Sequence, residues 1–400
     1  MGARSTLLRA VTMLAALACV VLLPAIVWAG GEVEAKKEAP KAEAKEATEA
    51  KEISAVEPAK PAINCMDCHG STPKYPVLGA RLGYDYSGHK NNGNSRYANG
   101  GGCQRCHTNE GFIDYVATGT ADASAFVEYP SQPGCFTCHA PHEKGDLSLR
   151  TVAPVKLSTG QVIDIGKGNL CANCHQARTP AATTVVPTAA KNISASWGAH
   201  HGPEADILAG TNAFEFAGKS YSSSPHMQVV ADGCVQCHGT QPSARYGWSP
   251  SLGGHSFKMV GDVHEAPKVN NSGCISCHKD ANQVPGTEYF NIMAKDDYDQ
   301  DGTKEPLQAE VRGLLDKFVN KNGSGALQKL ALPMYGPAGA WLTAKAETVR
   351  PLNEMGALYN YKMILEDRSL GVHNATYVLQ VLYDSLQAVD LKFDVSKRPQ

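Results

Sequence analysis

The stretch that decides this fold is Cys135-Phe136-Thr137-Cys138-His139-Ala140-Pro141-His142. It contains the pentapeptide C-x-x-C-H, which is typical of covalent attachment of a c-type haem. In that arrangement both cysteine thiols bond to the macrocycle and the adjacent histidine binds the iron from one side. His142 is too close in sequence to His139 to reach the other side of the same iron. We therefore expect His142 to bind the iron of a neighbouring haem.

The pentapeptide occurs six times, and the copies are numbered motifs 1 to 6 in chain order. Their residues are Cys65, Cys68 and His69; Cys103, Cys106 and His107; Cys135, Cys138 and His139; Cys171, Cys174 and His175; Cys234, Cys237 and His238; and Cys274, Cys277 and His278. Of the 13 cysteines only Cys19 is left over. Disulfides would not place a histidine after every pair, structural zinc would combine two ligand pairs, and a redox C-x-x-C would occur once. The repeat predicts six c-type haems, with the motif histidines as proximal iron ligands.

The composition fits a chain wrapped around cofactors. Hydrophobic residues make up 42% of the 400 residues and aromatic residues only 7%, so the macrocycles would supply much of the apolar core. The 38 glycines and 23 prolines indicate many loops. A net charge of −2 argues against a polycationic surface for nucleic acid. We predict a mostly α fold with many loops and few strands, in which a haem-organised core precedes a C-terminal helical region.

Residues 1–29 have the pattern of a signal peptide. Two arginines precede an apolar run from Ala10 to Val27. The run is nearly long enough to span a bilayer, so an uncleaved N-terminal anchor is the alternative. Residues 30–60 are rich in Ala, Lys and Glu and are predicted to form a disordered tether. Export agrees with the motifs, because c-type haem is attached outside the bacterial cytoplasm.

Two further segments follow the tether. Residues 61–290 carry all six motifs and are predicted to form a hexahaem cytochrome c domain, with strands at 161–165 and 183–186. Residues 291–400 lack cysteine and are predicted to be helical, because apolar residues recur there at helical spacing. The three sets are Leu307, Val311, Leu314, Leu315 and Phe318; Leu358, Tyr361, Met363 and Leu365; and Val378, Leu379, Leu382, Leu386 and Val389.

Closing the second face of every iron requires further ligands. Of the 14 histidines, eight lie outside the motifs and are the distal candidates: His89, His142, His200, His201, His226, His255, His264 and His373. His200 and His201 are adjacent, so we expect only one of them to bind iron. His264 is the expected spare. Met227 or Met259 is an alternative ligand that would raise the potential of its haem.

His373 is the sole histidine of the C-terminal region. It is either a capping or surface residue, or an axial ligand that ties this region to the haem core. With enough histidines to close all six irons, no open iron is required, and closed haems relay electrons. No C-x-x-C-K variant occurs, and no catalytic residue is predicted.

The segment Asp297-Tyr298-Asp299-Gln300-Asp301-Gly302 fits the opening of an EF-hand calcium loop. Asp297, Asp299 and Asp301 would supply oxygen ligands, and Glu305 falls at position 9. Position 12 is Gln308 rather than glutamate, and Glu310 lies two residues too far on. The loop predicts a structural calcium ion between the haem core and the helical region. A solvated acidic turn is the alternative.

The chain resembles the multihaem c-type cytochromes of anaerobic, metal-respiring bacteria. The six motifs carry the resemblance, together with His200-His201-Gly202-Pro203-Glu204-Ala205-Asp206, Gly253-Gly254-His255-Ser256-Phe257, the aspartate loop and Gly371-Val372-His373-Asn374. It implies closely packed haems, mostly bis-histidine irons and an exported location. The helical tail is similar to the last helices of the nitrite reductase superfamily, whose lysine motif is missing here.

These observations favour a periplasmic or cell-surface hexahaem electron carrier in anaerobic respiration. Its expected partners are other redox proteins, such as a quinol dehydrogenase or other cytochromes, with membrane contact only through an N-terminal anchor. One rival is a reductase or oxidase with one open haem that acts on nitrogen or sulfur oxyanions. A second rival is a subunit of a cytochrome filament or conduit complex.

Overall fold

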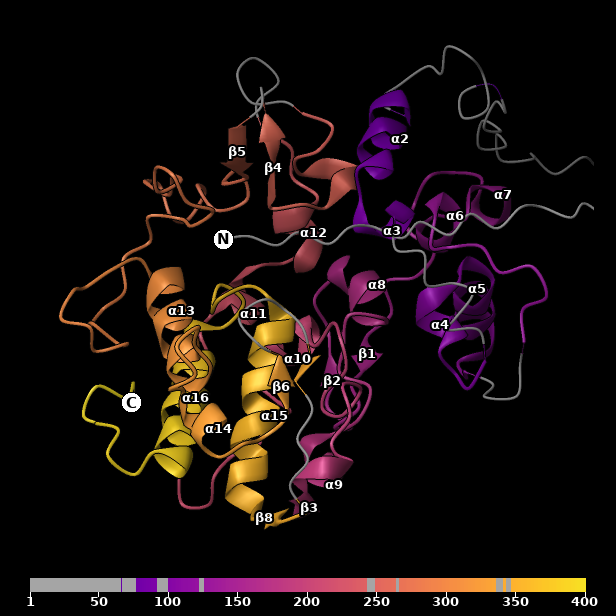
Figure 1. The fold of residues 1–400 in the computed structure, drawn as a ribbon. Coiled ribbons are helices and arrows are strands. Elements are labelled where there is room, and N and C mark those ends of the chain that lie inside the picture. The colour runs from indigo at the N-terminus through magenta and orange to yellow at the C-terminus, as the bar shows by residue number, and fades with distance from the viewer. Residues whose placement is uncertain are drawn as a thin grey trace, which may run out of the picture. The chain divides into compact units, whose positions relative to one another are not determined.

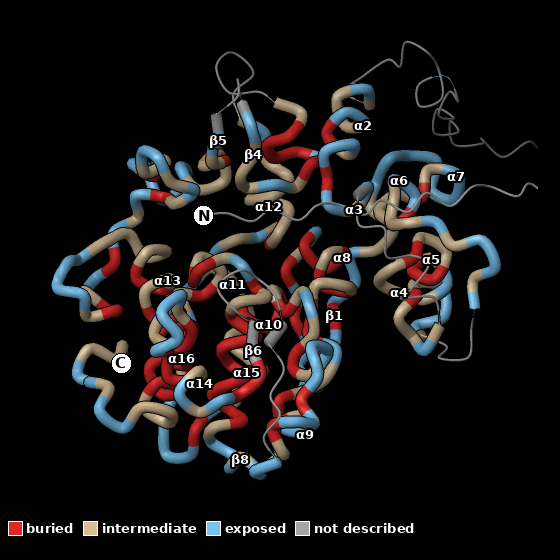
Figure 2. Tube along the Cα trace, viewed as in Figure 1, coloured by how far each residue is buried: buried red, intermediate tan, exposed pale blue. Residues whose placement is uncertain are grey.

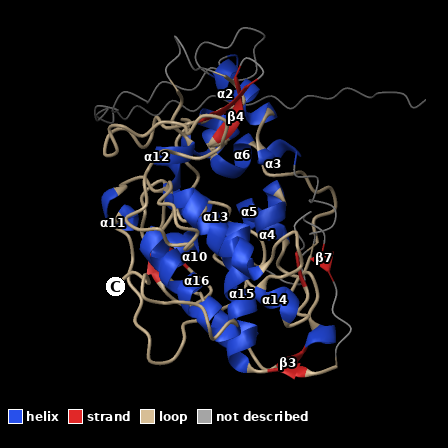
Figure 3. Cartoon of the chain, turned by 60° about the vertical axis from the view of Figure 1, so that its left-hand side comes forward, coloured by secondary structure: helices blue, strands red, loops and turns tan. Residues whose placement is uncertain are grey.

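The computed structural model describes residues 66, 77–91, 100–121, 126–242, 249–263, 266–335, 341–342 and 347–400. The predicted signal peptide and tether, most of motif 1 and His264 lie outside the described residues. Residues 59–400 form one compact unit. Figure 1 shows its elements, and Figure 3 shows that helices dominate and that the strands are short. The prediction of a mostly α fold with few strands is confirmed.

Short helices accompany the motifs, and the longest helices lie near the C-terminus. In the described residues the helices are α2 (Val77–Asp85), α3 (Gly88–Asn91), α4 (Gln104–His107), α5 (Asn109–Thr118), α6 (Cys135–Cys138), α7 (Pro141–Lys144), α8 (Gly168–Ala172), α9 (Ala181–Thr184), α10 (Glu204–Ala209), α11 (His226–Val229), α12 (Cys234–His238), α13 (Leu307–Phe318), α14 (Ala326–Lys329), α15 (Leu352–Asp367) and α16 (Ala375–Val389). Two 3₁₀ turns, η1 (Ala190–Asn192) and η2 (Gly254–Ser256), complete them.

The strands form antiparallel pairs. They are β1 (Val155–Lys156) with β2 (Val162–Ile163), β3 (Thr188–Ala189) with β8 (Val349–Arg350), β4 (Val260–Val263) with β5 (Ala266–Val269), and β6 (Met334–Tyr335) with β7 (Trp341–Leu342). The strand predicted at 161–165 is present as β2. The strand predicted at 183–186 is wrong, because 181–184 is helix α9. Pro180 ends the preceding extended segment, and the hydroxyls of Thr183 and Thr184 donate to its carbonyl, which favours a helical turn.

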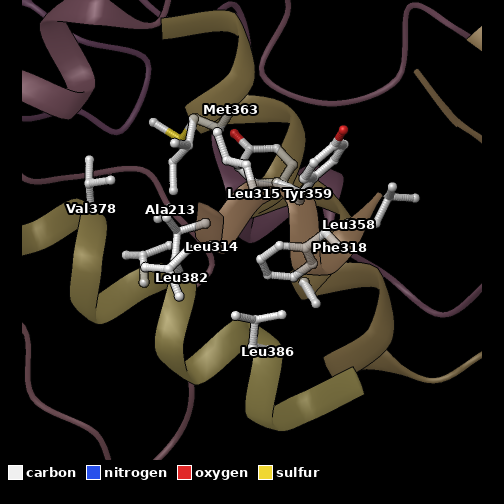
Figure 4. Close-up of a cluster of buried hydrophobic side chains, with 14 of the residues drawn as sticks. Ala213, Leu314, Leu315, Phe318, Leu358, Tyr359, Met363, Val378, Leu382 and Leu386 are labelled. Atoms are coloured by element: carbon white, nitrogen blue, oxygen red, sulfur yellow. The ribbon is translucent and has the colours of Figure 1, made fainter. Parts of the chain in front are cut away.

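Helices α13, α15 and α16 form the main core. Leu314, Leu358 and Leu382 are fully buried within it, and Figure 4 shows their side chains interleaved. Burying each such side chain stabilises the fold by roughly 1.5–3 kcal/mol. The helical spacing predicted for all three segments is confirmed. Helix α16 begins at Asn374, whose side chain accepts a hydrogen bond from the Tyr377 amide at 3.2 Å.

The main core extends to the segment between motifs 4 and 5. Phe214 donates its amide to the Asn360 side chain at 2.7 Å and accepts from it at 2.9 Å. A Cβ on Gly356 would lie 2.1 Å from the Phe214 ring, so glycine permits this close approach within α15. Figure 2 shows buried residues concentrated around α15 and α16, whereas α2 to α7 are mostly half-buried or exposed. The main core thus anchors one side of the motif-bearing segment.

Candidate haem-binding sites

Each of motifs 2 to 6 forms a tight turn that places its two thiols and its histidine close together. In motif 3 the His139 amide donates to the Cys135 carbonyl at 2.9 Å, and in motif 4 the His175 amide donates to the Cys171 carbonyl at 2.9 Å. Motif 6 has the same bond, from His278 to Cys274, at 2.8 Å. This one-turn geometry suits thioether bonds and an iron ligand on a single macrocycle. Motifs 2 to 6 therefore share one local backbone geometry.

Motif 3 is held in place by its own flanking chain. The amide of Arg150 donates to the Cys138 carbonyl at 2.7 Å, and its guanidinium donates to the Phe136 carbonyl. The same guanidinium forms an ion pair with Glu143 at 2.9 Å. These contacts fix the octapeptide that carries His139 and His142.

Every described motif histidine faces a histidine from a distant part of the chain. The ring centroids lie 6.3 Å apart for His107 and His200, 6.3 Å for His139 and His255, 6.1 Å for His175 and His89, 6.3 Å for His238 and His373, and 6.2 Å for His278 and His226. Bonds of about 2 Å from a metal to imidazole nitrogens on opposite faces place ring centroids about 6 Å apart. The five near-equal spacings therefore fit one iron between each pair.

The space around these pairs also fits haem. A continuous cavity of about 3680 Å³ is lined by the cysteines and histidines of motifs 2 to 6 and by seven of the distal candidates. The cavity contacts more apolar than polar surface. The Nδ1 atom of His107 is buried without a hydrogen-bond partner among the described residues. A cavity of this lining can hold several macrocycles in contact.

Neighbouring motifs approach one another through their thiols. Cys106 of motif 2 donates to the Asn173 carbonyl of motif 4 at 3.9 Å, and Cys174 of motif 4 donates to the Arg105 carbonyl of motif 2 at 3.7 Å. The thiols of Cys171 in motif 4 and Cys234 in motif 5 lie close enough to interact electrostatically. Motifs 5 and 6 also touch, because a Cβ on Gly273 would lie 2.8 Å from Cα of Cys237. The chain thus places its motifs in the order 2, 4, 5, 6, with motif 4 at an internal position.

Five of the paired histidines have a partner on Nδ1, and these partners are of two kinds. His175 bonds to the Glu204 carboxylate at 3.2 Å and His373 bonds to the Asp367 carboxylate at 2.6 Å. Three others bond to backbone carbonyls: His139 to Leu147 at 2.7 Å, His226 to Val372 at 2.9 Å and His238 to Phe257 at 2.8 Å. Partners on Nδ1 fix the orientation of a ring whose other nitrogen binds a metal.

The pKa values follow these partners. Burial lowers the pKa of His175, but the hydrogen bond and charge of Glu204 outweigh it and raise the pKa to about 9. Asp367 likewise overcomes burial and raises the pKa of His373 to about 9. Burial and the nearby His175 lower the pKa of His89 to about 4.

The remaining candidates are placed differently. His201 bonds through Nδ1 to Glu366 at 2.7 Å, whereas its neighbour His200 faces His107. The ring of His142 lies 5.2 Å from that of Phe136 and lines the cavity. His69 and His264 lie outside the described residues. Met227 packs against a small apolar cluster that includes Ile165.

The aspartate loop gathers acidic side chains before α13. Carboxylate oxygens of Asp297, Asp299 and Glu310 lie within 4.8 Å of one another, as do those of Asp299, Asp301 and Glu305. Burial, with the charges of Asp301 and Glu310, raises the pKa of Asp299 to about 6. Gly302 has φ of 98°, which is the sharp turn expected at that position.

Two further contacts modify this loop. Gln308 accepts from the Phe290 amide at 2.9 Å and so turns away from the loop, whereas the Glu310 carboxylate accepts from the amides of Tyr298 at 2.7 Å and Glu305 at 2.8 Å. The ammonium group of Lys397 lies 2.9 Å from Asp297. A cation would therefore share Asp297 with Lys397.

Sequence reasoning missed Glu204, Asp367 and Glu310 as functional residues. Glu204 stood within a quoted segment but had no assigned role. Asp367 and His373 are separated by one loop. Their spacing in the sequence does not reveal that the two side chains are in contact. Only the folded chain brings these carboxylates to the histidines and the aspartate loop.

The motifs, the facing imidazoles and the helix-rich fold define the class of multihaem c-type cytochromes, as the sequence predicted. The chain is similar to two C-type polyheme cytochromes of Geobacter sulfurreducens. It is 24% identical to OmcB over 345 residues, which covers 72% of this chain and 44% of that protein. It is 24% identical to OmcC over 350 residues, which covers 74% of this chain and 43% of that protein. The chain thus spans less than half the length of these curated relatives.

Two solved structures are also similar. The outer cell wall cytochrome OcwA has a TM-score of 0.42 and 19% identity, with 78% of this chain and 50% of that chain covered. An undecahaem cytochrome from the S-layer of Carboxydothermus ferrireducens has a TM-score of 0.39 and 18% identity, with 73% and 38% covered. No family model matches. In the part of the chain that is described, every helix is too short or too polar to cross a bilayer.

Proposed function

We propose that this chain is a hexahaem electron relay in which every iron is closed by two histidines. The proposal rests on the five facing imidazole pairs, each of which brings a motif histidine opposite a histidine that is distant in sequence. Covalent c-type haem, once attached, supplies reversible one-electron redox chemistry. The protein orients the imidazoles, excludes further ligands and sets the spacing of the sites.

Three distal candidates remain for the sixth iron, namely His142, His201 and His264, of which His264 is the spare expected from the sequence. His89, His200, His226, His255 and His373 each face a described motif histidine. His201 is directed to Glu366, and His142 lines the same cavity as the five pairs. We assign His142 as the distal ligand to the motif 1 haem, opposite His69. The octapeptide of motif 3 would then couple two haems rigidly.

The thiol contacts support a contiguous relay through motifs 2, 4, 5 and 6. Motif 4 contacts motifs 2 and 5, and the Cys138 thiol of motif 3 lies within electrostatic range of both motif 4 cysteines. Motif 4 is therefore the junction of the network. Electrons would enter and leave through the outer sites and cross this junction.

The cellular setting extends this proposal. The signal-like residues 1–29 and the c-type motifs support export to the periplasm or cell surface. We propose that the protein works in anaerobic respiration and exchanges electrons with other redox proteins, such as a quinol dehydrogenase or another cytochrome. A tether at 30–60 would allow the haem domain to move between partners.

We also propose that the aspartate loop binds one calcium ion. The clustered oxygens of Asp297, Asp299, Asp301, Glu305 and Glu310 support it, since calcium takes six to eight oxygen ligands. The ion would stiffen the start of α13 and would not take part in electron transfer. Lys397 would have to move from Asp297 when the ion binds.

The pair of adjacent histidines offers a matched test of the relay. In the mature protein, His200→Ala should convert one low-spin haem to high-spin and create one site that binds cyanide. His201→Ala should leave every haem low-spin, because His201 faces Glu366 instead of a motif histidine. Optical and EPR spectra give the spin states, and intact mass gives the haem number. The reverse pattern, or fewer than six haems on the wild-type chain, would refute the proposal.

A further inference from the structure

The hydrogen bonds on the paired imidazoles divide the haem sites into two groups. A carboxylate accepts from one imidazole at motif 4, through Glu204, and at motif 5, through Asp367. At motifs 3 and 6 the accepting groups are the neutral carbonyls of Leu147 and Val372. Among the described sites of motifs 2 to 6, a carboxylate is therefore hydrogen-bonded to a paired imidazole at the two internal sites, motifs 4 and 5.

The two carboxylates are well placed to act on the irons. Asp367 has a fully buried side chain, and it bonds to His373 at 2.6 Å. Glu204 is half-buried, and it lies within electrostatic range of His373 as well as in contact with His175. A charge in a low-dielectric site is felt more strongly than one in water. Motifs 4 and 5 are also adjacent through Cys171 and Cys234, so one acidic pair acts on one haem pair.

The neighbouring motif 2 site lacks such a hydrogen bond among the described residues, although the Glu366 carboxylate lies within electrostatic range of His200. The Nδ1 atom of His107 is buried without a partner among the described residues. Its facing residue, His200, lies within electrostatic range of the Arg178 guanidinium. Glu366 is nearby, but it bonds to His201. No carboxylate in the described part of the chain is hydrogen-bonded to either imidazole of this site.

Hydrogen bonding to a carboxylate increases the basicity of a ligating imidazole, and a more basic ligand stabilises the more positive metal. A ferric bis-imidazole haem carries one more positive charge than the ferrous form. We propose that Glu204 and Asp367 give the haems of motifs 4 and 5 the lowest reduction potentials among motifs 2 to 6. This inference rests on the proposed hexahaem relay and adds to it the potential profile. The internal haems would be reduced last, and Glu204 and Asp367 are positioning residues that act through His175 and His373.

The test uses two isosteric substitutions and a matched control in the haem-loaded protein. Glu204→Gln and Asp367→Asn remove the charge but keep the shape of each side chain. Glu366→Gln makes the same change on a carboxylate that bonds to His201, which does not face a motif histidine. Spectroelectrochemical titration, followed by haem-resolved EPR or NMR, gives the midpoint of each haem.

Each of the first two variants should shift one midpoint in the positive direction. The expected size is on the order of tenfold in the oxidised-to-reduced ratio at fixed potential, which is about 59 mV for one electron. Glu366→Gln should leave the midpoints of motifs 4 and 5 in place, and any shift should be confined to motif 2, because Glu366 lies within electrostatic range of His200. Unchanged midpoints in both Glu204→Gln and Asp367→Asn, with six low-spin haems, would overturn the inference and leave the relay intact.

The wild-type protein supplies a second measurement that needs no variant. If the haems of motifs 4 and 5 are among the first to be reduced, the inference is wrong even where a variant fails to mature. Wild-type chains that lack haem at these motifs would instead refute the relay itself. The two failures are therefore distinguishable.

Discussion

The C-terminal helical core and the segment of motifs 2 and 3 are built in different ways. In α13, α15 and α16 apolar side chains fill the interior, and residues such as Leu314, Leu358 and Leu382 are fully buried. Among the described residues of 77–149, Phe112 and Ala140 are the sole buried apolar residues. That segment faces the large cavity instead. One region carries its own core, and the other requires haem to provide one.

This difference separates two sources of stability. The helical core gains its free energy from side chains that the sequence marks by their helical spacing. In the proposed relay, the segment at 77–149 would depend on covalent haem and on the imidazole pairs that join distant parts of the chain. His373 connects the helical core to the haem sites, because it lies in the loop before α16 and its ring faces His238 of motif 5.

The largest difference between the two regions should appear when the chain is made without haem. We expect residues 77–149 to lose protection from amide exchange almost completely, since so little apolar surface is buried there without the macrocycles. The amides of α15 and α16 should keep substantial protection. Hydrogen exchange with mass spectrometry compares the two regions in one experiment. Equal loss in both would show that the helical core cannot form independently of haem.

A substitution in the C-terminal helical core tests whether that region is stabilised by its own apolar packing. Leu382→Ala should cost about 2–5 kcal/mol of stability, because it leaves a cavity among α13, α15 and α16. The haem number should not change. Leu391→Ala is the matched control, since Leu391 is 89% exposed. Denaturant unfolding monitored by circular dichroism measures the difference. A cost below 1 kcal/mol for Leu382→Ala would contradict the packing described here.

The calcium loop should give the smallest effect. Saturating calcium at a hundred times its dissociation constant would stabilise the protein by about 2.7 kcal/mol. A chelator should therefore lower Tm by a few degrees and leave the haem spectra unchanged. Lys397→Met should strengthen binding, because the ammonium group no longer competes at Asp297. If neither chelator nor added calcium changes the Tm, the loop does not bind calcium and is an acidic turn paired with Lys397.

The local elements could be predicted from the sequence, but their long-range pairing could not. The motif spacing specifies each haem turn, and the apolar spacing specifies α13, α15 and α16. His200 and His201 are indistinguishable in sequence, and only the backbone turn at His200, with φ of 72°, directs one ring to His107 and the other to Glu366. The error at 183–186 has a different, local origin, because hydrogen bonds from Thr183 and Thr184 to the Pro180 carbonyl overrode β propensity there.

The most direct test of the central claim is quantitative EPR of the fully oxidised mature protein. Two imidazoles on every iron predict low-spin ferric signals only, with intensity that integrates to six haems. Addition of cyanide should leave those signals unchanged. A high-spin ferric signal that disappears with cyanide would reveal an open iron, and would contradict the claim that paired histidines close every haem in the relay.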